Sequence, residues 1–100
     1  MAKYVLVFKG GSIPGSEEEQ QRVMAAWMSW FEGLGGAVVD MGNPFGASKS
    51  VGNGGSVGGG GDATGYSILS ADSLDAAVEH AKGCPILENG SVEVYEALDM

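Results

Sequence analysis

The first hydrophobic segment, residues 3–9, places apolar side chains on both faces of an extended chain. β-Branched and aromatic residues followed by glycine are typical of a strand. A strand with one face in water would alternate apolar with polar residues. This segment therefore predicts a central strand that is covered on both sides. The side chains of its two faces are Tyr4, Leu6 and Phe8 on one, and Val5 and Val7 on the other.

The next segment, residues 16–34, has the periodicity of an amphipathic helix. Ser16 and Glu19 have the spacing of a capping box, and acidic residues fill the first turn. Apolar residues then recur every three or four positions and form one broad stripe, which indicates a helix packed on a core. Glycines at 33, 35 and 36 end it. The stripe consists of Val23, Trp27, Trp30, Phe31 and Leu34.

The rest of the pattern predicts two further strands, a second helix and a last strand. The strands cover residues 37–41, 65–70 and 91–98, and the helix follows Asp72 as its N-cap, with Asp75 at the third helical position. Between residues 42 and 65 the chain is rich in glycine. It predicts a long loop that contains a short strand near residues 48–51.

This order of elements predicts a single α+β domain over residues 1–100. Strand, helix, strand, short strand, helix and strand are the ferredoxin-like split βαβ arrangement, an antiparallel sheet with both helices on one face. Two helices leave the other face of the sheet uncovered, although it also carries apolar side chains. An apolar patch of this kind on a monomer is unusual. The pattern therefore predicts a homodimer in which two sheets face each other.

Composition narrows the possible partners and locations. The net charge of −8 disfavours nucleic acids and anionic membranes, which bind clusters of Lys and Arg. No run of apolar residues is long enough to span a membrane, and the sequence begins without the pattern of a signal peptide. We expect a cytoplasmic protein. The only cysteine, Cys84, and the only histidine, His80, supply too few ligands for a metal site, and we expect no metal or cofactor.

Three polar residues lie in apolar strand segments and are the candidates for catalysis. Asp40, Glu93 and Tyr95 would converge in an apolar cavity if all three faced the space between the sheets. A carboxylate in such a cavity can act as an acid or a base. The alternative is a structural ion pair in which Glu93 binds a lysine of a neighbouring strand, either Lys3 or Lys9.

Several segments in order resemble the YCII-related, or DGPF-type, domain family. The resemblance spans nearly the whole chain, and it implies a ferredoxin-like subunit that forms a dimeric α+β barrel. Some members of the family have been proposed as enzymes through a His–Asp pair, and others accompany sigma factors of the extracytoplasmic-function type. The segments are Ala26–Phe31, Asp40–Gly46, Gly65–Leu69, Ala71–Ala77, Ala81–Leu87 and Gly90–Tyr95.

The sequence departs from the family pattern at the positions that matter for catalysis. It has no Asp-Gly-Pro-Phe motif, its first helix has no histidine, and Glu88, Asn89 and Gly90 occupy a turn where a histidine often appears. The proposed His–Asp pair is therefore not carried over.

Three functions remain open from the sequence. The first is a homodimer that binds a small molecule in a pocket between or beside the sheets, with Trp27, Asn43 and Tyr66 as candidate ligand-binding residues. Aromatic residues at helical spacing are more commonly core than pocket wall, so Trp27 has both interpretations. The second is a cofactor-free enzyme of the lyase, isomerase or monooxygenase type. The third is a regulatory protein associated with a sigma factor. Fold alone does not decide among them.

Overall fold

The computed structural model describes residues 2–11 and 15–99, and its main element is a four-stranded antiparallel sheet with strand order β2-β5-β1-β6. A second sheet contains only β3 and β4. The elements are β1 (Ala2–Gly10), α1 (Glu17–Leu34), β2 (Val38–Asp40), β3 (Lys49–Val51), β4 (Val57–Gly59), β5 (Ala63–Ala71), α2 (Leu74–Ala81) and β6 (Gly90–Ala97), with short 3-10 turns at Gly35–Ala37, Asn53–Gly55 and Pro85–Glu88.

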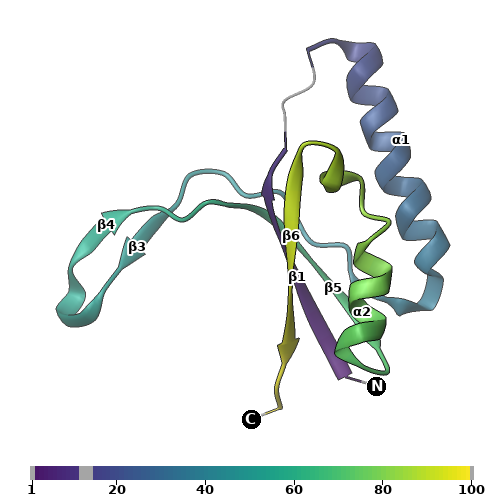
Figure 1. Cartoon of the computed structure of the whole chain (residues 1–100). Helices are drawn as coiled ribbons and strands as arrows, with labels where there is room; N and C mark the ends of the chain where they lie inside the picture. The colour runs from purple at the N-terminus through teal and green to yellow at the C-terminus, as the bar shows by residue number, and fades with distance from the viewer. Residues whose placement is uncertain (1, 12–14, 100) are drawn as a thin grey trace.

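Both helices lie on one face of the four-stranded sheet, and we call the opposite face the open face (Figure 1). The predicted ferredoxin-like α+β fold is confirmed. Strand β1 pairs with β5 on one side and with β6 on the other, so its predicted central position is also confirmed. The sheet ends at β2 on one edge and at β6 on the other.

The core lies between the sheet and the helices. Alternate residues of β1 and β5 point into it, and Leu6, Ser67 and Leu69 are completely buried. Ser67 is a polar residue at this depth, and its hydroxyl donates a hydrogen bond to the carbonyl oxygen of Met41, at 2.7 Å. That bond joins the chain after β2 to the middle of the sheet. The other buried core residues are Tyr4, Phe8, Ala71, Ala77, Ala81 and Cys84.

The two helices begin as side-chain caps require, although one cap differs from the prediction. Ser16 caps α1 by accepting the backbone N–H of Glu19, at 3.1 Å, as predicted. In α2 the predicted N-cap, Asp72, is wrong. Ser73 has the extended backbone of an N-cap, and its hydroxyl accepts the N–H of Ala76. The helix therefore starts one residue later, and Asp75 takes the second helical position.

The glycine-rich segment forms a hairpin, which only partly matches the predicted loop. The short strand near residues 48–51 is confirmed as β3. Its partner β4 was not predicted, because Val57–Gly59 has almost no side-chain pattern and is a strand only through its pairing with β3. The hairpin extends away from the open face of the sheet (Figure 1). We call residues 46–61 the arm.

The turn after β2 lies directly against β5. Tyr66 donates its N–H to the carbonyl of Asn43, at 3.3 Å, and Phe45 donates its N–H to the carbonyl of Thr64, at 2.9 Å. Gly42 has a φ of +78°, and a Cβ at this position would overlap the backbone carbonyl of Tyr66. Only glycine fits both the backbone conformation and the close approach.

Replacing Gly42 with alanine should therefore destabilise the protein by about 2 kcal/mol or more, since a left-handed residue alone costs roughly 1–3 kcal/mol. The matched control is Gly46→Ala, where a Cβ meets no atom within 4 Å and φ is not positive. We expect that control to leave stability nearly unchanged in urea denaturation. Equal destabilisation by both substitutions would contradict the packing described for Gly42.

Candidate functional site

An apolar pocket of about 420 Å³ lies between α1, β5 and the turn after β2. Its volume is within the range of small-molecule sites, and aromatic and methionine side chains dominate its wall. The lining residues are Phe8, Met24, Trp27, Met28, Phe31, Met41, Gly42, Asn43, Pro44, Thr64, Gly65, Tyr66, Ser67 and Ile86.

Aromatic contacts hold α1 over the sheet and shape this pocket. The Trp27 ring meets the buried Phe8 edge-on, with 5.1 Å between the ring centroids. Trp30 is fixed to α2, because its indole N–H donates to the carbonyl of His80 at 3.0 Å. Trp27 thus contacts the core and also lines the pocket, so it combines the two roles that the sequence analysis considered for it.

The polar groups of the pocket lie near the turn after β2. Thr64 donates its hydroxyl to the carbonyl of Phe8, at 3.2 Å, and Ser67 donates to Met41. Asn43 accepts the backbone N–H of Tyr66 with its own backbone carbonyl, and it is one of the residues that line the pocket. Among the lining residues there is no carboxylate, histidine, lysine, arginine or cysteine. The pocket can therefore bind apolar rings and a few neutral hydrogen-bonding groups.

All three predicted ligand-binding residues border this pocket, but they do so in different ways. Trp27 and Asn43 come from α1 and the turn. Tyr66 follows Gly65 and precedes Ser67, both buried beneath the helices, so alternation points its ring to the open face. There the ring stacks on Phe45, with 5.7 Å between the centroids.

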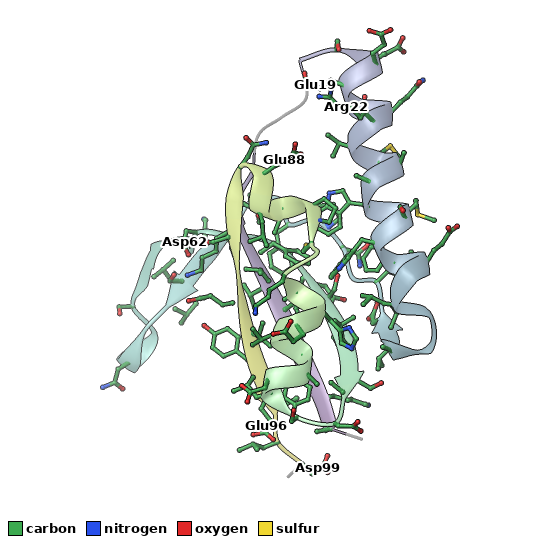
Figure 2. The ribbon with its side chains drawn as sticks, turned by 45° about the vertical axis from the view of Figure 1, so that its right-hand side comes forward. Glu19, Arg22, Asp62, Glu88, Glu96 and Asp99 are labelled. Atoms are coloured by element: carbon green, nitrogen blue, oxygen red, sulfur yellow. The ribbon has the colours of Figure 1, made fainter. Side chains whose placement is uncertain are left out.

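A second pocket, of about 450 Å³, adjoins the first and shares Trp27 and Ile86 with it. Charged side chains line this one. Figure 2 shows Glu19 and Arg22 on the N-terminal part of α1, with Glu88 across from them. The Arg22 guanidinium lies 3.8 Å from the Glu19 carboxylate. The space beneath α1 therefore changes from charged to apolar along the helix.

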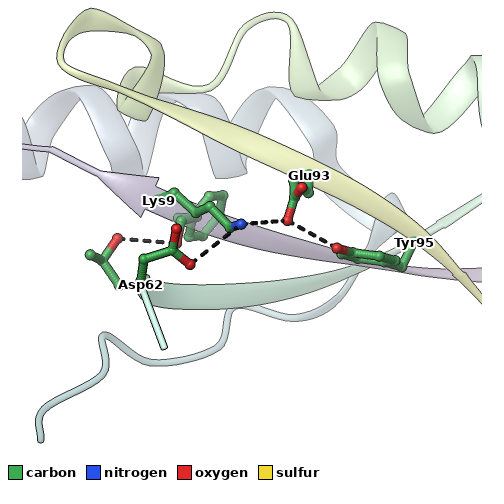
Figure 3. Close-up of polar contacts among 6 residues, drawn as sticks. Lys9, Asp62, Glu93 and Tyr95 are labelled. Carbon is green, nitrogen blue, oxygen red and sulfur yellow. Dashed lines mark hydrogen bonds and ion pairs between the residues drawn. The ribbon is translucent and has the colours of Figure 1, made fainter. Parts of the chain in front are cut away.

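Two of the three predicted catalytic residues form a polar network on the open face (Figure 3). The Lys9 ammonium lies 3.0 Å from the Glu93 carboxylate and 3.4 Å from that of Asp62, and the Tyr95 hydroxyl donates to Glu93 at 2.9 Å. The structural ion pair considered from the sequence is thus present, with Lys9 as the partner. Glu93 lies opposite Val7, so Lys9 is its diagonal neighbour.

This network shifts the pKa values of its members. Hydrogen bonding from Lys9, and then from Tyr95, lowers the pKa of Glu93 below its ordinary value. Hydrogen bonds to Glu93 and then to Asp62 raise the pKa of Lys9, and the bond to Glu93 raises that of Tyr95. A carboxylate held ionised and a lysine held protonated are poor proton donors and acceptors near neutral pH.

Asp40 lies far from this network within the chain. It is on β2, at the opposite edge of the sheet from β6, and three strand spacings separate these edges by about 14 Å. Its carboxylate accepts the backbone N–H of Gly42 at 2.8 Å and approaches the Tyr66 hydroxyl at 3.5 Å. The hypothesis that Asp40, Glu93 and Tyr95 converge is not fulfilled within one chain.

The environment of Cys84 disfavours a nucleophilic role. Its side chain is buried, and burial raises the pKa of the thiol to about 11. The reactive thiolate is therefore scarce at neutral pH. Among the described residues, no group of three or more His, Cys, Asp or Glu side chains could hold a metal ion.

Sequence reasoning did not single out the methionines that form the rim of the apolar pocket. Met24 and Met28 are one helical turn apart on α1, and Met41 faces them from the turn after β2. All three are half-exposed. The signal that could have found them is the i, i+4 pair of methionines beside Trp27, since exposed methionines often border adaptable binding surfaces.

Comparison with known families agrees with this fold. The model of the YCII-related domain matches residues 3–100. The chain belongs to the YCII-related domain family. No helix in the part of this YCII-related domain that the structure describes is long and apolar enough to cross a membrane. The search of curated proteins finds no significant match.

One solved structure similar to this YCII-related domain is 5-chloro-2-hydroxyhydroquinone dehydrochlorinase from Burkholderia phenoliruptrix AC1100, in complex with 2,5-dihydroxybenzoquinone. The two share 18% sequence identity, with a TM-score of 0.58 over 98% of this chain and 95% of the other. At this identity the likeness shows the fold alone.

The Lys9–Glu93 pair should make the stability of the YCII-related domain depend on acid pH. The pKa of Glu93 is lowered from 4.5 on folding. The stabilisation is therefore present above pH 4.5 and lost as the pH falls through the lowered pKa, because the folded state must then take up a proton. Replacing Glu93 with glutamine should lower the thermal midpoint by a few °C near pH 7.

Below the lowered pKa of Glu93, the variant and the original chain should melt at nearly the same temperature. Glu79→Gln is the matched control, because Glu79 pairs with Lys82 at 2.8 Å on the surface of α2, away from this network. A difference between the E93Q variant and the original chain that stays constant from pH 7 to pH 3 would contradict the assignment to Glu93.

Proposed function

We propose that this protein is a homodimer that binds a small, largely apolar ring compound in the pocket beneath α1. The observation that carries the proposal is the pocket of about 420 Å³ with an aromatic and methionine wall and neutral polar groups at one end. A planar ring would lie against Trp27 and Phe31, and its oxygen or nitrogen substituents would reach Asn43 and Thr64. This is the usual composition of a small-molecule site.

The similar dehydrochlorinase supports the choice of ligand class, because its structure holds 2,5-dihydroxybenzoquinone. A hydroxylated ring of this size combines an apolar face with peripheral hydrogen-bonding groups, which matches the wall and the polar end of the pocket. The enzyme hypothesis has less support. General acid–base catalysis needs a group that titrates near neutral pH, and the lining residues of this pocket include none of the side chains that commonly do so.

Isothermal titration calorimetry with 2,5-dihydroxybenzoquinone and with a series of hydroxylated benzenes tests the binding site. Met28→Trp should raise the dissociation constant at least tenfold, because the larger side chain fills the pocket from its rim. Ala25→Trp is the matched control: Ala25 is also exposed on α1 and lines no part of the pocket. We expect that control to bind as the original chain does.

Unchanged binding by the M28W variant would place the ligand elsewhere. Failure of the original chain to bind any compound of the series would contradict the ligand class.

The homodimer is proposed from the open face of the sheet. Val5, Val7 and Ile68 lie side by side in its middle, since Val5 is opposite Ile68 in the pairing of β1 with β5. These three residues are partly exposed in the single chain, and Tyr95 on β6 is 52% exposed beside them. Two such faces packed about 10 Å apart would remove this apolar strip from water.

Sedimentation equilibrium tests the dimer. Replacing Ile68 with glutamate should shift the protein to monomer, because a charge would then be buried in the middle of the interface. The control is Leu74→Glu, which places the same charge on a 47% exposed residue of α2, in the helical layer. We expect Leu74→Glu to remain dimeric. A monomeric original chain at micromolar concentration would refute the dimer.

A further inference from the structure

Among residues 2–11 and 15–99, the arm contacts the rest of its own chain only near its base. Within the same residues, β3 and β4 pair only with each other, and every residue from 43 to 62 is exposed. An isolated two-stranded hairpin is marginally stable in water and needs a further surface to pack against. The body of the chain does not provide that surface along the arm, which points away from the open face (Figure 1).

The base of the arm is nevertheless fixed in direction. On one side, Phe45 stacks on Tyr66 and donates its N–H to Thr64. On the other side, the Asp62 carboxylate pairs with Lys9 of β1, at 3.4 Å (Figure 3). Both attachments use side chains on the open face of the sheet. The arm is therefore aimed to the side from which a facing sheet would approach.

The turn at the tip of the arm, between β3 and β4, has a defined backbone conformation. Gly54 and Gly55 take positive φ values of 78° and 85°, and Gly52 donates its N–H to the carbonyl of Ser56, at 2.6 Å. Glycine is the residue that adopts such angles without strain. The glycines here form a defined hairpin turn, within the segment that the sequence predicts as a long loop with one short strand.

An apolar pair lies next to this turn. Val51 and Val57 are directly opposite each other in the hairpin and are 72% and 67% exposed. In a cross-strand pair, two β-branched side chains form one contiguous apolar patch. Within the described residues this patch has no covering partner, because the whole arm is exposed.

The length and the charge of the arm indicate a second copy of this chain as its partner. Residues 45–52 reach about 25 Å when extended, whereas two facing sheets lie only about 10 Å apart. An arm from one open face therefore reaches past a facing sheet to its flank. The radius of gyration of 15.0 Å exceeds the roughly 13 Å of a compact chain of this length, as expected for an element that packs on another molecule.

Electrostatics favour the same partner. Lys49 is the only charged residue between positions 46 and 61, and the chain as a whole carries −8. The arm thus carries one positive charge and a second copy carries a net charge of −8, which favours their association.

We propose that the arm clasps a second copy of this chain, with Val51 and Val57 packed against the body of that copy. This inference rests on the homodimer proposed above and goes beyond it, because two open faces could pair without their arms. The arm would then add apolar contact at the flank of the partner. Each copy supplies one arm and receives the other, as twofold symmetry requires.

Photo-crosslinking tests the clasp directly. A Val51→Cys variant is labelled with benzophenone maleimide, which leaves Cys84 unmodified because that thiol is buried. A mixture of ¹⁴N and ¹⁵N protein is then irradiated, and mixed-isotope peptides identify links between chains. We expect a covalent dimer as the main product. The control is Ser29→Cys, on the exposed surface of α1, which should give little inter-chain product.

The possible outcomes distinguish the clasp, which is the packing of one chain's arm on the other chain, from dimerisation itself. Sedimentation of the labelled protein before irradiation establishes whether a dimer is present. A dimer in which position 51 links only to its own chain, or to nothing, overturns the clasp and leaves the dimer intact. A monomeric original chain overturns both.

A second measurement does not depend on the label. The double variant Val51→Ser and Val57→Ser should raise the dimer dissociation constant at least tenfold, whereas Leu74→Ser, at a 47% exposed residue of α2 in the helical layer, should not. An unchanged dissociation constant for the double variant would overturn the clasp.

Discussion

Strand β1 lies between β5 and β6, and its alternate residues serve two different surfaces. Tyr4, Leu6 and Phe8 are buried beneath the helices, whereas Val5 and Val7 point to the open face. A chain of this length supplies helices for only one side of its sheet, so a central strand that is apolar on both sides leaves an unsatisfied face. The open face therefore keeps an apolar strip that the helices of its own chain do not cover.

The position of α1 depends on the same buried face of the sheet, which includes Phe8. None of its residues is fully buried, and the helix is held by ring contacts around Trp27 and by the Trp30 hydrogen bond to α2. Because contact is concentrated at these aromatic side chains, space remains beneath the helix on both sides of Trp27. The turn after β2 closes one side, and its tight approach to β5 at Gly42 fixes where the polar end of the pocket lies. In the proposed function, the helical layer binds the ligand and the open face packs against a second copy of the chain.

Local sequence patterns predicted the elements whose formation depends on residues close together in the sequence. The apolar stripe and the Ser16 cap identified α1, and the two-sided hydrophobicity of residues 3–9 identified the central strand. Where adjacent residues compete for one role, the pattern was insufficient: Asp72 and Ser73 can both cap a helix, and only the backbone conformation selects Ser73. Strand β4 escaped notice because glycines carry no side-chain periodicity, so its pairing with β3 is the only sign of a strand.

The geometry of the candidate site could not be predicted in the same way, because it depends on contacts between residues far apart in the sequence. Trp30 and His80 are 50 positions apart, and their hydrogen bond decides how α1 sits over the sheet. The choice of Lys9 over Lys3 as the partner of Glu93 depends on the register of β1 with β6. The strand order separates Asp40 from Glu93 and Tyr95, because it places β2 and β6 at opposite edges of the sheet. Sequence reasoning could name these residues without fixing their distances.

The strand order has a further consequence for solubility. Strand β6 is an edge of the sheet, and an edge strand of eight residues offers unpaired backbone groups to which another extended chain could add. Glu93 and Glu96 lie along it, and Asp99 follows close to its end. Charges on an edge strand oppose such uncontrolled addition, because like charges would meet. These acidic side chains thus oppose aggregation through the exposed edge strand β6.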